Sequence, residues 1–253
     1  EDLALPGLDP RPEATPTDSP WPQGDGAPTG LAPASQAKLD AVLDDAFSEP
    51  DPKRPRRTRA VVVVHRGQLI AERYAPGFDA STRLLGWSMT KSIVNALVGL
   101  LVAEGKLDVH QPVAAPEWSA PNDPRASLSY DVLLRMSSGL KFWEQYWNPL
   151  SHVSSMLFHY AAAAAYAGSF PLVAEPDTRW SYASGTTNVV ARALRGVIGG
   201  DHASYLSYPQ RALFDRIGMR SAQVELDASG HFVGSSFSYA TARDWARFGQ
   251  LYL

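Results

Sequence analysis

The sequence contains no cysteine, so neither disulfide bonds nor thiol chemistry is available to it. The redox compartment is therefore left open by composition. The chain shows no signal peptide and begins with Glu1 rather than Met, which is typical of a processed or trimmed product. A periplasmic or secreted location and a cytoplasmic one are both compatible with these features, and the localisation stays unknown.

The chain also has no large excess of positively or negatively charged residues. The chain has 23 Lys and Arg against 26 Asp and Glu, a net charge of −3, which gives no electrostatic reason to expect nucleic acid as a partner. The longest apolar run, residues 93–103, is interrupted by Asn95 and Gly99 and is too short to span a bilayer. We therefore expect no nucleic-acid partner and no membrane span.

Several common motifs are absent as well. The lack of G-x-S-x-G argues against an α/β-hydrolase. The six histidines include no H-E-x-x-H and no pair at i, i+4, which argues against a zinc site. Neither G-x-x-x-x-G-K-[ST] nor G-x-G-x-x-G occurs, so nucleotide binding has no support. The sequence implies no metal and no organic cofactor.

Local patterns predict the first elements. Residues 1–33 hold eight prolines and no helical or strand period, which predicts an extended leader. A helix is expected over 34–47 with Ser35 as its N-cap. Residues 60–65 and 68–74 are β-rich and joined by a short turn, which predicts a hairpin. The all-valine first strand suggests a central position covered on both faces.

The rest of the chain is mainly helical in pattern. Apolar residues cover most of a helical circumference over 88–104, which predicts a buried helix ended by Gly105. Two strands followed by a block of helices, without alternation, argue against a Rossmann or TIM-barrel fold. Further helices are expected at 129–137, 151–167, 185–198, 203–217 and 240–252.

These patterns divide the chain into successive regions. The expected regions are a Pro-rich leader (1–33), a helix and the first strands of an α/β region (34–80), a mostly helical region that carries the site (81–235), and the start of a return to the α/β region (236–253). The sequence stops inside the helical pattern "ARDWARFGQLYL", and two strands alone rarely make a stable sheet. We therefore expect that C-terminal strands are absent from this chain.

The spacing S-x-x-K is the first candidate for chemistry, and it occurs three times. Ser35 with Lys38 lies on an amphipathic helix, and Ser138 with Lys141 lies in a turn, so neither pair has a special setting. Ser88 instead begins an apolar helix, where its hydroxyl would lie near unpaired amides. Lys91 would lie one turn on, on the same face, where it could accept the serine proton. The alternative is an N-cap serine beside a solvated lysine.

Two downstream segments favour the chemical interpretation. With "WSMTKS", the segments "LLRMSSGLKFWEQYWNP" (133–149) and "PDTRWSYASGTTNVV" (176–190) resemble, in order and spacing, the serine β-lactamase and penicillin-binding-protein superfamily. The resemblance covers roughly residues 35–253 and is strongest to the class C and family VIII esterase branch, closest to the 6-aminohexanoate-dimer (nylon-oligomer) hydrolases. It implies an α/β (α+β), β-lactamase/transpeptidase-like fold, in which an antiparallel sheet with flanking helices accompanies a mostly helical region.

The resemblance also implies roles for individual residues. Ser88 would be the acylated nucleophile, Lys91 its activating partner, and Tyr182 the group that shuttles the proton to the leaving group. Ser184 stands where the family's Tyr-x-Asn motif has Asn, which counts against recognition of a β-lactam. Tyr146 would lie on a loop that closes over the substrate and would hydrogen-bond the scissile amide.

Trp180 completes the substrate-binding candidates, with Tyr146 and Ser184. Plainer interpretations remain for the aromatic residues, because Tyr182 could be a half-buried core side chain and Tyr146 a surface one. The family's third motif, Lys/His-x-Gly on a strand, would follow Leu253. That strand supplies one of two oxyanion amides, and loss of one such donor costs about 100- to 1,000-fold in rate.

The sequence therefore predicts a serine hydrolase that cleaves small-molecule esters or amides through an acyl-enzyme on Ser88. Activity as a D-alanyl carboxypeptidase or β-lactamase is one alternative. The other is a catalytically silent, penicillin-binding-like recognition module. A homodimer and a missing C-terminal segment or second chain are left open as partners.

Overall fold

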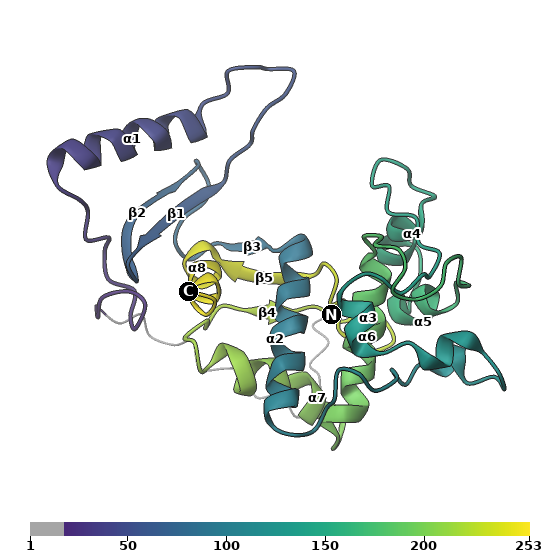
Figure 1. Cartoon of the computed structure of the whole chain (residues 1–253). Coiled ribbons are helices and arrows are strands. Elements are labelled where there is room, and N and C mark those ends of the chain that lie inside the picture. The colour runs from purple at the N-terminus through teal and green to yellow at the C-terminus, as the bar shows by residue number, and fades with distance from the viewer. Residues whose placement is uncertain (1–17) are drawn as a thin grey trace. The chain divides into compact units, whose positions relative to one another are not determined.

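The computed structural model describes residues 18–253, so the first half of the predicted leader lies outside the described residues. The described chain is an α/β protein with small antiparallel sheets and many helices (Figure 1). It forms two compact units. One contains Leu85–Leu213 and Gln223–Ser238, and the other contains residues 18–84, Phe214–Ala222 and Tyr239–Leu253.

The hairpin lies in the second of these units and is confirmed as predicted. Strands β1 (Ala60–His65) and β2 (Gln68–Tyr74) pair antiparallel, with a register shift between Val63 and Val64. Arg66 and Gly67 both adopt positive φ, as a two-residue hairpin turn requires. The predicted central position of β1 is wrong for the described residues, because its valines are only half-buried and it pairs with β2 alone.

Helices and an ordered loop pack around this hairpin. Helix α1 (Pro33–Phe47) begins at a proline after Ala32, so the expected Ser35 cap is not used. Helix α8 (Ala242–Gln250) lies against β1, and Arg243 of α8 donates a 2.7 Å hydrogen bond to Glu72 of β2. Trp21 is buried beneath Arg247, whose guanidinium donates to the Pro22 carbonyl at 2.9 Å.

A second sheet has three short strands in the order β3-β5-β4. The sequence pattern did not reveal them, because each is too short to show an alternation of apolar and polar residues. They are β3 (Arg83–Leu85), β4 (Gln223–Val224) and β5 (Ser238–Thr241).

The other unit is mainly helical, and its core is built on helices α2 (Thr90–Ala103) and α6 (Ser184–Ile198). The apolar face of α2 is buried as predicted, and Gly105 follows the helix at φ +69°. Side chains of α6 such as Val190 and Leu194 are buried as well. Burial of apolar surface is the main force that holds α2 and α6 together.

Three predicted helices differ from the observed ones. The single helix expected over 151–167 is two helices, α4 (His152–Phe158) and α5 (Ala163–Gly168), because the carboxylate of Asp227 accepts the N–H of Ala163 and starts a new helix there. The helix expected over 203–217 ends early.

Pro209 explains that early ending. Helix α7 (His202–Pro209) runs into a π-helical turn over Gln210–Phe214, since a proline cannot donate the next helical hydrogen bond. The helix expected at 129–137 is shorter, because α3 (Tyr130–Leu134) stops before Met136, which adopts φ +58°.

Candidate active site

Ser88 stands at the start of α2. It lies in a 3₁₀ turn, η1 (Trp87–Met89), that leads directly into the helix, and its side chain is exposed. Trp87 adopts φ +45°, a conformation that costs a bulky residue about 1–3 kcal/mol and clusters at functional sites. The hydroxyl is therefore presented at a helix N-terminus, where a developing negative charge is favoured.

Lys91 lies one helical turn further on and is half-buried. Its ammonium donates hydrogen bonds to three acceptors: Ser88 Oγ at 3.1 Å, Ser184 Oγ at 3.1 Å and the Ser235 carbonyl at 2.9 Å. All three directions available to an ammonium are thus used inside the protein. Such a lysine is held in place rather than free to sample solvent.

Tyr182 reaches the same serine from the segment that leads into α6. Its hydroxyl donates to Ser88 Oγ at 2.8 Å, and the Lys91 nitrogen lies 5.0 Å from the centre of its ring. The structure therefore brings Lys91 and Tyr182 within hydrogen-bonding reach of Ser88. A hydroxyl flanked by an amine and a phenol is an arrangement that can move its proton during attack on a carbonyl.

Close packing against α2 and α6 explains how Ser235 reaches Lys91. A Cβ on Gly234 would lie 2.7 Å from Val94 of α2 and 2.7 Å from Ala191 of α6, so only glycine allows this approach. Asn188 of α6 accepts the N–H of Ser235 at 2.9 Å. The 234–236 segment is therefore fixed where the Ser235 carbonyl can accept the hydrogen bond from Lys91.

Ser184 is completely buried at the first turn of α6. It accepts the lysine hydrogen bond, and its hydroxyl donates in turn to the carboxylate of Glu144. The same carboxylate accepts the main-chain N–H of Ser184 at 2.8 Å. The structure thus places Ser184 beneath the Ser88–Lys91–Tyr182 cluster, with no surface open to a ligand.

The two aromatic candidates lie in different positions. Tyr146 is 54% exposed, and its hydroxyl donates to Glu144 at 2.6 Å. Burial, together with that hydrogen bond, raises the pKa of Tyr146 to about 12, so it remains a donor at neutral pH. Trp180 is 68% exposed, and its ring centre lies 6.5 Å from that of Tyr182.

A cavity of about 520 Å³ opens beside Ser88. That volume falls in the range of about 300–1,000 Å³ that is usual for small-molecule sites. None of the side chains that line it carries a charge. They are Trp87, Ser88, Tyr146, Ser154, Leu157, Phe158, Tyr182 and Ser236, so Tyr146 belongs to the lining while Trp180 and Ser184 do not.

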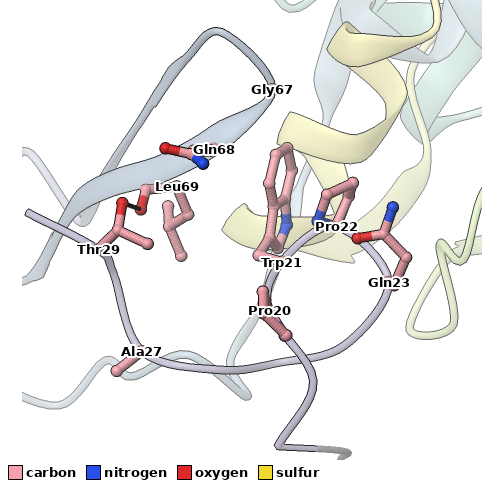
Figure 2. Close-up of a pocket in the computed structure, with 9 residues that line it drawn as sticks. All are labelled: Pro20, Trp21, Pro22, Gln23, Ala27, Thr29, Gly67, Gln68 and Leu69. Atoms are coloured by element: carbon pink, nitrogen blue, oxygen red, sulfur yellow. Dashed lines mark hydrogen bonds between the residues drawn. The ribbon is translucent and has the colours of Figure 1, made fainter.

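A second cavity of about 270 Å³ lies in the other unit, between the 20–29 loop and strand β2 (Figure 2). Its lining contains no ionisable side chain and no residue of the Ser88 cluster. Within residues 18–253, no group of three or more His, Asp or Glu side chains could hold a metal ion, and no helix is long and apolar enough to cross a membrane.

Sequence reasoning missed several residues of the site. Glu144 stands two positions before Tyr146 in the segment 133–149. A lone acidic residue among those aromatic residues is a signal that points to it. Ser235 gave no signal, because it contributes a main-chain carbonyl. The other two S-x-x-K pairs stay apart from the site: Ser138 accepts the N–H of Leu140 at 3.2 Å, and Ser35 is exposed.

The α/β fold with its small antiparallel sheets and many helices is that of the serine β-lactamase and penicillin-binding-protein superfamily. The chain belongs to the Beta-lactamase family, which it matches over residues 43–253. The predicted fold and family are confirmed by this match.

A curated protein with a similar sequence shows which members of the family resemble this chain. A 6-aminohexanoate-dimer hydrolase from Paenarthrobacter ureafaciens is 28% identical over 208 residues, which are 78% of this chain and 52% of the relative. The chain therefore spans about half the length of that curated relative.

Solved structures agree with this assignment. A proposed 6-aminohexanoate-dimer hydrolase from Bacillus anthracis is similar with a TM-score of 0.68 and 26% identity, over 85% of this chain and 56% of that one. A D-stereospecific amidohydrolase from Streptomyces sp. shares the fold with a TM-score of 0.62 and 16% identity, over 85% of this chain and 72% of the other.

Proposed function

We propose that the protein is a serine hydrolase that cleaves esters or amides of small neutral molecules through an acyl-enzyme. The observation that carries the proposal is the convergence of Lys91 Nζ and the Tyr182 hydroxyl on Ser88 Oγ, at 3.1 and 2.8 Å. Each group alone has a plain structural explanation. Together, at the mouth of a cavity, they form a nucleophile with its proton acceptors.

The reaction would run in two steps. Ser88 Oγ attacks the carbonyl carbon and passes its proton to the Tyr182–Lys91 pair, which has first released one proton to solvent. The C–O or C–N bond to the leaving group then breaks as Tyr182 returns a proton to that alcohol or amine. Water attacks the resulting ester, gives its proton to the same pair and releases the acid, so the serine recovers its hydrogen.

The cavity indicates the kind of substrate. An uncharged lining rich in aromatic and aliphatic groups favours a neutral, apolar group next to the scissile bond, and would leave an ammonium or carboxylate unpaired. Ser184 is fully buried and bonded to Glu144, so it cannot offer a polar group to the side chain of a β-lactam. These two features favour simple esters and amides over penicillins.

Covalent labelling tests the proposal. The full-length protein is incubated with a fluorophosphonate, and the modified peptide is located by mass spectrometry. We expect one adduct on Ser88, none in Ser88→Ala, and wild-type labelling in Ser35→Ala, which removes a serine of the same S-x-x-K spacing. Labelling that persists in Ser88→Ala, or none in the wild type, would overturn the proposal.

Turnover then separates the substrate classes. We expect a p-nitrophenyl ester of a medium-length fatty acid to be hydrolysed faster than a penicillin or a linear amide that carries a charged terminus. Preferred hydrolysis of the penicillin would favour the alternative of a β-lactamase or D-alanyl carboxypeptidase.

A further inference from the structure

Glu144 is a half-buried neighbour of the reaction centre that does not belong to the cavity lining and makes no hydrogen bond to Ser88. Its carboxylate receives three hydrogen bonds, from the Ser184 N–H at 2.8 Å, from the Ser184 hydroxyl, and from the Tyr146 hydroxyl at 2.6 Å. A carboxylate that accepts this many bonds is held in one orientation. Its place in the structure therefore needs an explanation.

Ser184 links this carboxylate to the lysine. A serine hydroxyl has one hydrogen, and Ser184 gives it to Glu144, so its lone pairs are free to accept from Lys91 at 3.1 Å. The two hydrogen bonds therefore run in one direction, from the Lys91 ammonium to the Ser184 hydroxyl and from that hydroxyl to the Glu144 carboxylate. Glu144 lies one hydroxyl group away from the charge that contacts Ser88.

Helix capping explains only part of this arrangement. Ala183 gives α6 no side-chain cap, and Glu144 supplies one through the Ser184 N–H, where a negative charge is favoured by the helix dipole. A cap would not require the hydroxyl of Ser184 to be buried between Glu144 and Lys91. Nor would it require a bond to Tyr146, which lines the cavity.

We infer that Glu144 is a positioning residue for the hydrolysis: through Ser184 it holds Lys91 in place beside Ser88, and through Tyr146 it fixes part of the cavity wall to the same network. The inference rests on the proposed function and deepens it. The carboxylate lies one hydroxyl group from Lys91, so its removal changes the electrostatic field at the Ser88 cluster as well as the position of the lysine.

Substitution at position 144 tests the charge. In Glu144→Gln we expect kcat for a p-nitrophenyl ester to fall about 10- to 100-fold, as for loss of one hydrogen bond to a charged group. The acid limb of the pH profile of kcat/KM should move to lower pH, because the variant lacks the negative charge beside the cluster. Glu144→Asp should restore part of the rate. The matched control is Glu175→Gln, at an exposed position, which should keep the wild-type profile.

Ser184→Ala separates positioning from capping. This variant keeps the main-chain N–H that Glu144 caps and removes the bridging hydroxyl. We expect it to reproduce the rate loss and the shifted pH profile with little change in Tm. The double variant Glu144→Gln with Ser184→Ala should be no slower than the slower single variant, since both substitutions interrupt the same series of hydrogen bonds between Glu144 and Lys91.

Two outcomes would overturn the inference. One is a wild-type kcat and pH profile in Glu144→Gln. The other is a lower Tm and rate in Glu144→Gln with an unshifted profile and a fully active Ser184→Ala, which would leave Glu144 a helix cap alone. In either case fluorophosphonate would still label Ser88, so failure of this inference is distinguishable from failure of the proposed function.

Discussion

Tyr182 donates a 2.8 Å hydrogen bond to Ser88 although 94 residues separate them in the chain. They meet because each lies just before a helix: Ser88 precedes α2, Tyr182 precedes α6, and the two helices pack together.

Replacing Tyr182 with Phe should remove the proton shuttle while keeping the ring. We expect kcat to fall by about 100- to 10,000-fold, the usual contribution of a general acid–base group. Tyr160→Phe is the matched control, since Tyr160 is exposed and outside the cluster. Ester hydrolysis measured at saturating substrate checks the prediction. A kcat within about twofold of the wild type would remove Tyr182 from the mechanism.

The segment that carries Glu144 is held against α6 by a glycine. A Cβ on Gly185 would lie 2.6 Å from the ring of Phe142, so Gly185→Ala should force the ring to move. We expect the free energy of unfolding to fall by about 1–3 kcal/mol, as for overpacking of a core. The measurement is urea unfolding followed by circular dichroism.

Gly196 provides the control within the same helix. Nothing lies within 4 Å of a Cβ at that position, so Gly196→Ala should stabilise α6 by about 0.5–1 kcal/mol through helix propensity alone. Equal effects of the two substitutions would show that the contact between Gly185 and Phe142 does not constrain the segment.

Local signals explain which parts of the fold could be predicted from the sequence. The hairpin carries its own turn in Arg66 and Gly67, and α2 carries its own apolar face and the terminating Gly105. The break between α4 and α5 depends on Asp227, which is 64 residues from the Ala163 that it caps. A pattern read along the chain cannot show a partner at that distance.

The candidate site likewise contains contacts that local spacing predicts and contacts that only the folded structure creates. Ser88 and Lys91 are spaced along one helix, and that spacing alone places the amine near the hydroxyl. Glu144 meets Ser184 only because two loops pack at one helix start, 40 residues apart in the chain. Without that contact, a serine after Tyr182 was more naturally interpreted as a substrate-binding group than as a buried link.

His152 makes stability depend on pH. Its ring nitrogen Nδ1 accepts the N–H of Trp143 at 3.0 Å, which requires that nitrogen to be unprotonated. Burial, with the nearby charge of Lys141, lowers the pKa of His152 below its ordinary 6.5. The unfolded chain therefore takes up this proton first as pH falls, so the stability is complete above pH 6.5 and decreases below it.

His152→Asn keeps an acceptor but cannot titrate. Its Tm should change less than that of the wild type between about pH 7.5 and about pH 5.5, measured by scanning calorimetry. His159→Asn, at an exposed ring in the same region, should keep the wild-type dependence. Parallel curves for wild type and His152→Asn would contradict the assignment.

The cavity wall should set the preference for acyl chain length. Phe158 lines the cavity, is 64% exposed and contacts Phe237 with ring centres 6.2 Å apart, so its truncation should leave the core intact. Phe158→Ala should lower kcat/KM for p-nitrophenyl octanoate by about 3- to 10-fold, from apolar area that the longer chain no longer covers. The acetate ester is too short to use that area and should be hydrolysed at the wild-type rate. Val173→Ala, exposed and outside the lining, should leave both esters unaffected. An equal loss for the two esters would place the effect on the acyl transfer step rather than on binding of the chain, and the apolar wall would then have no part in selecting the substrate.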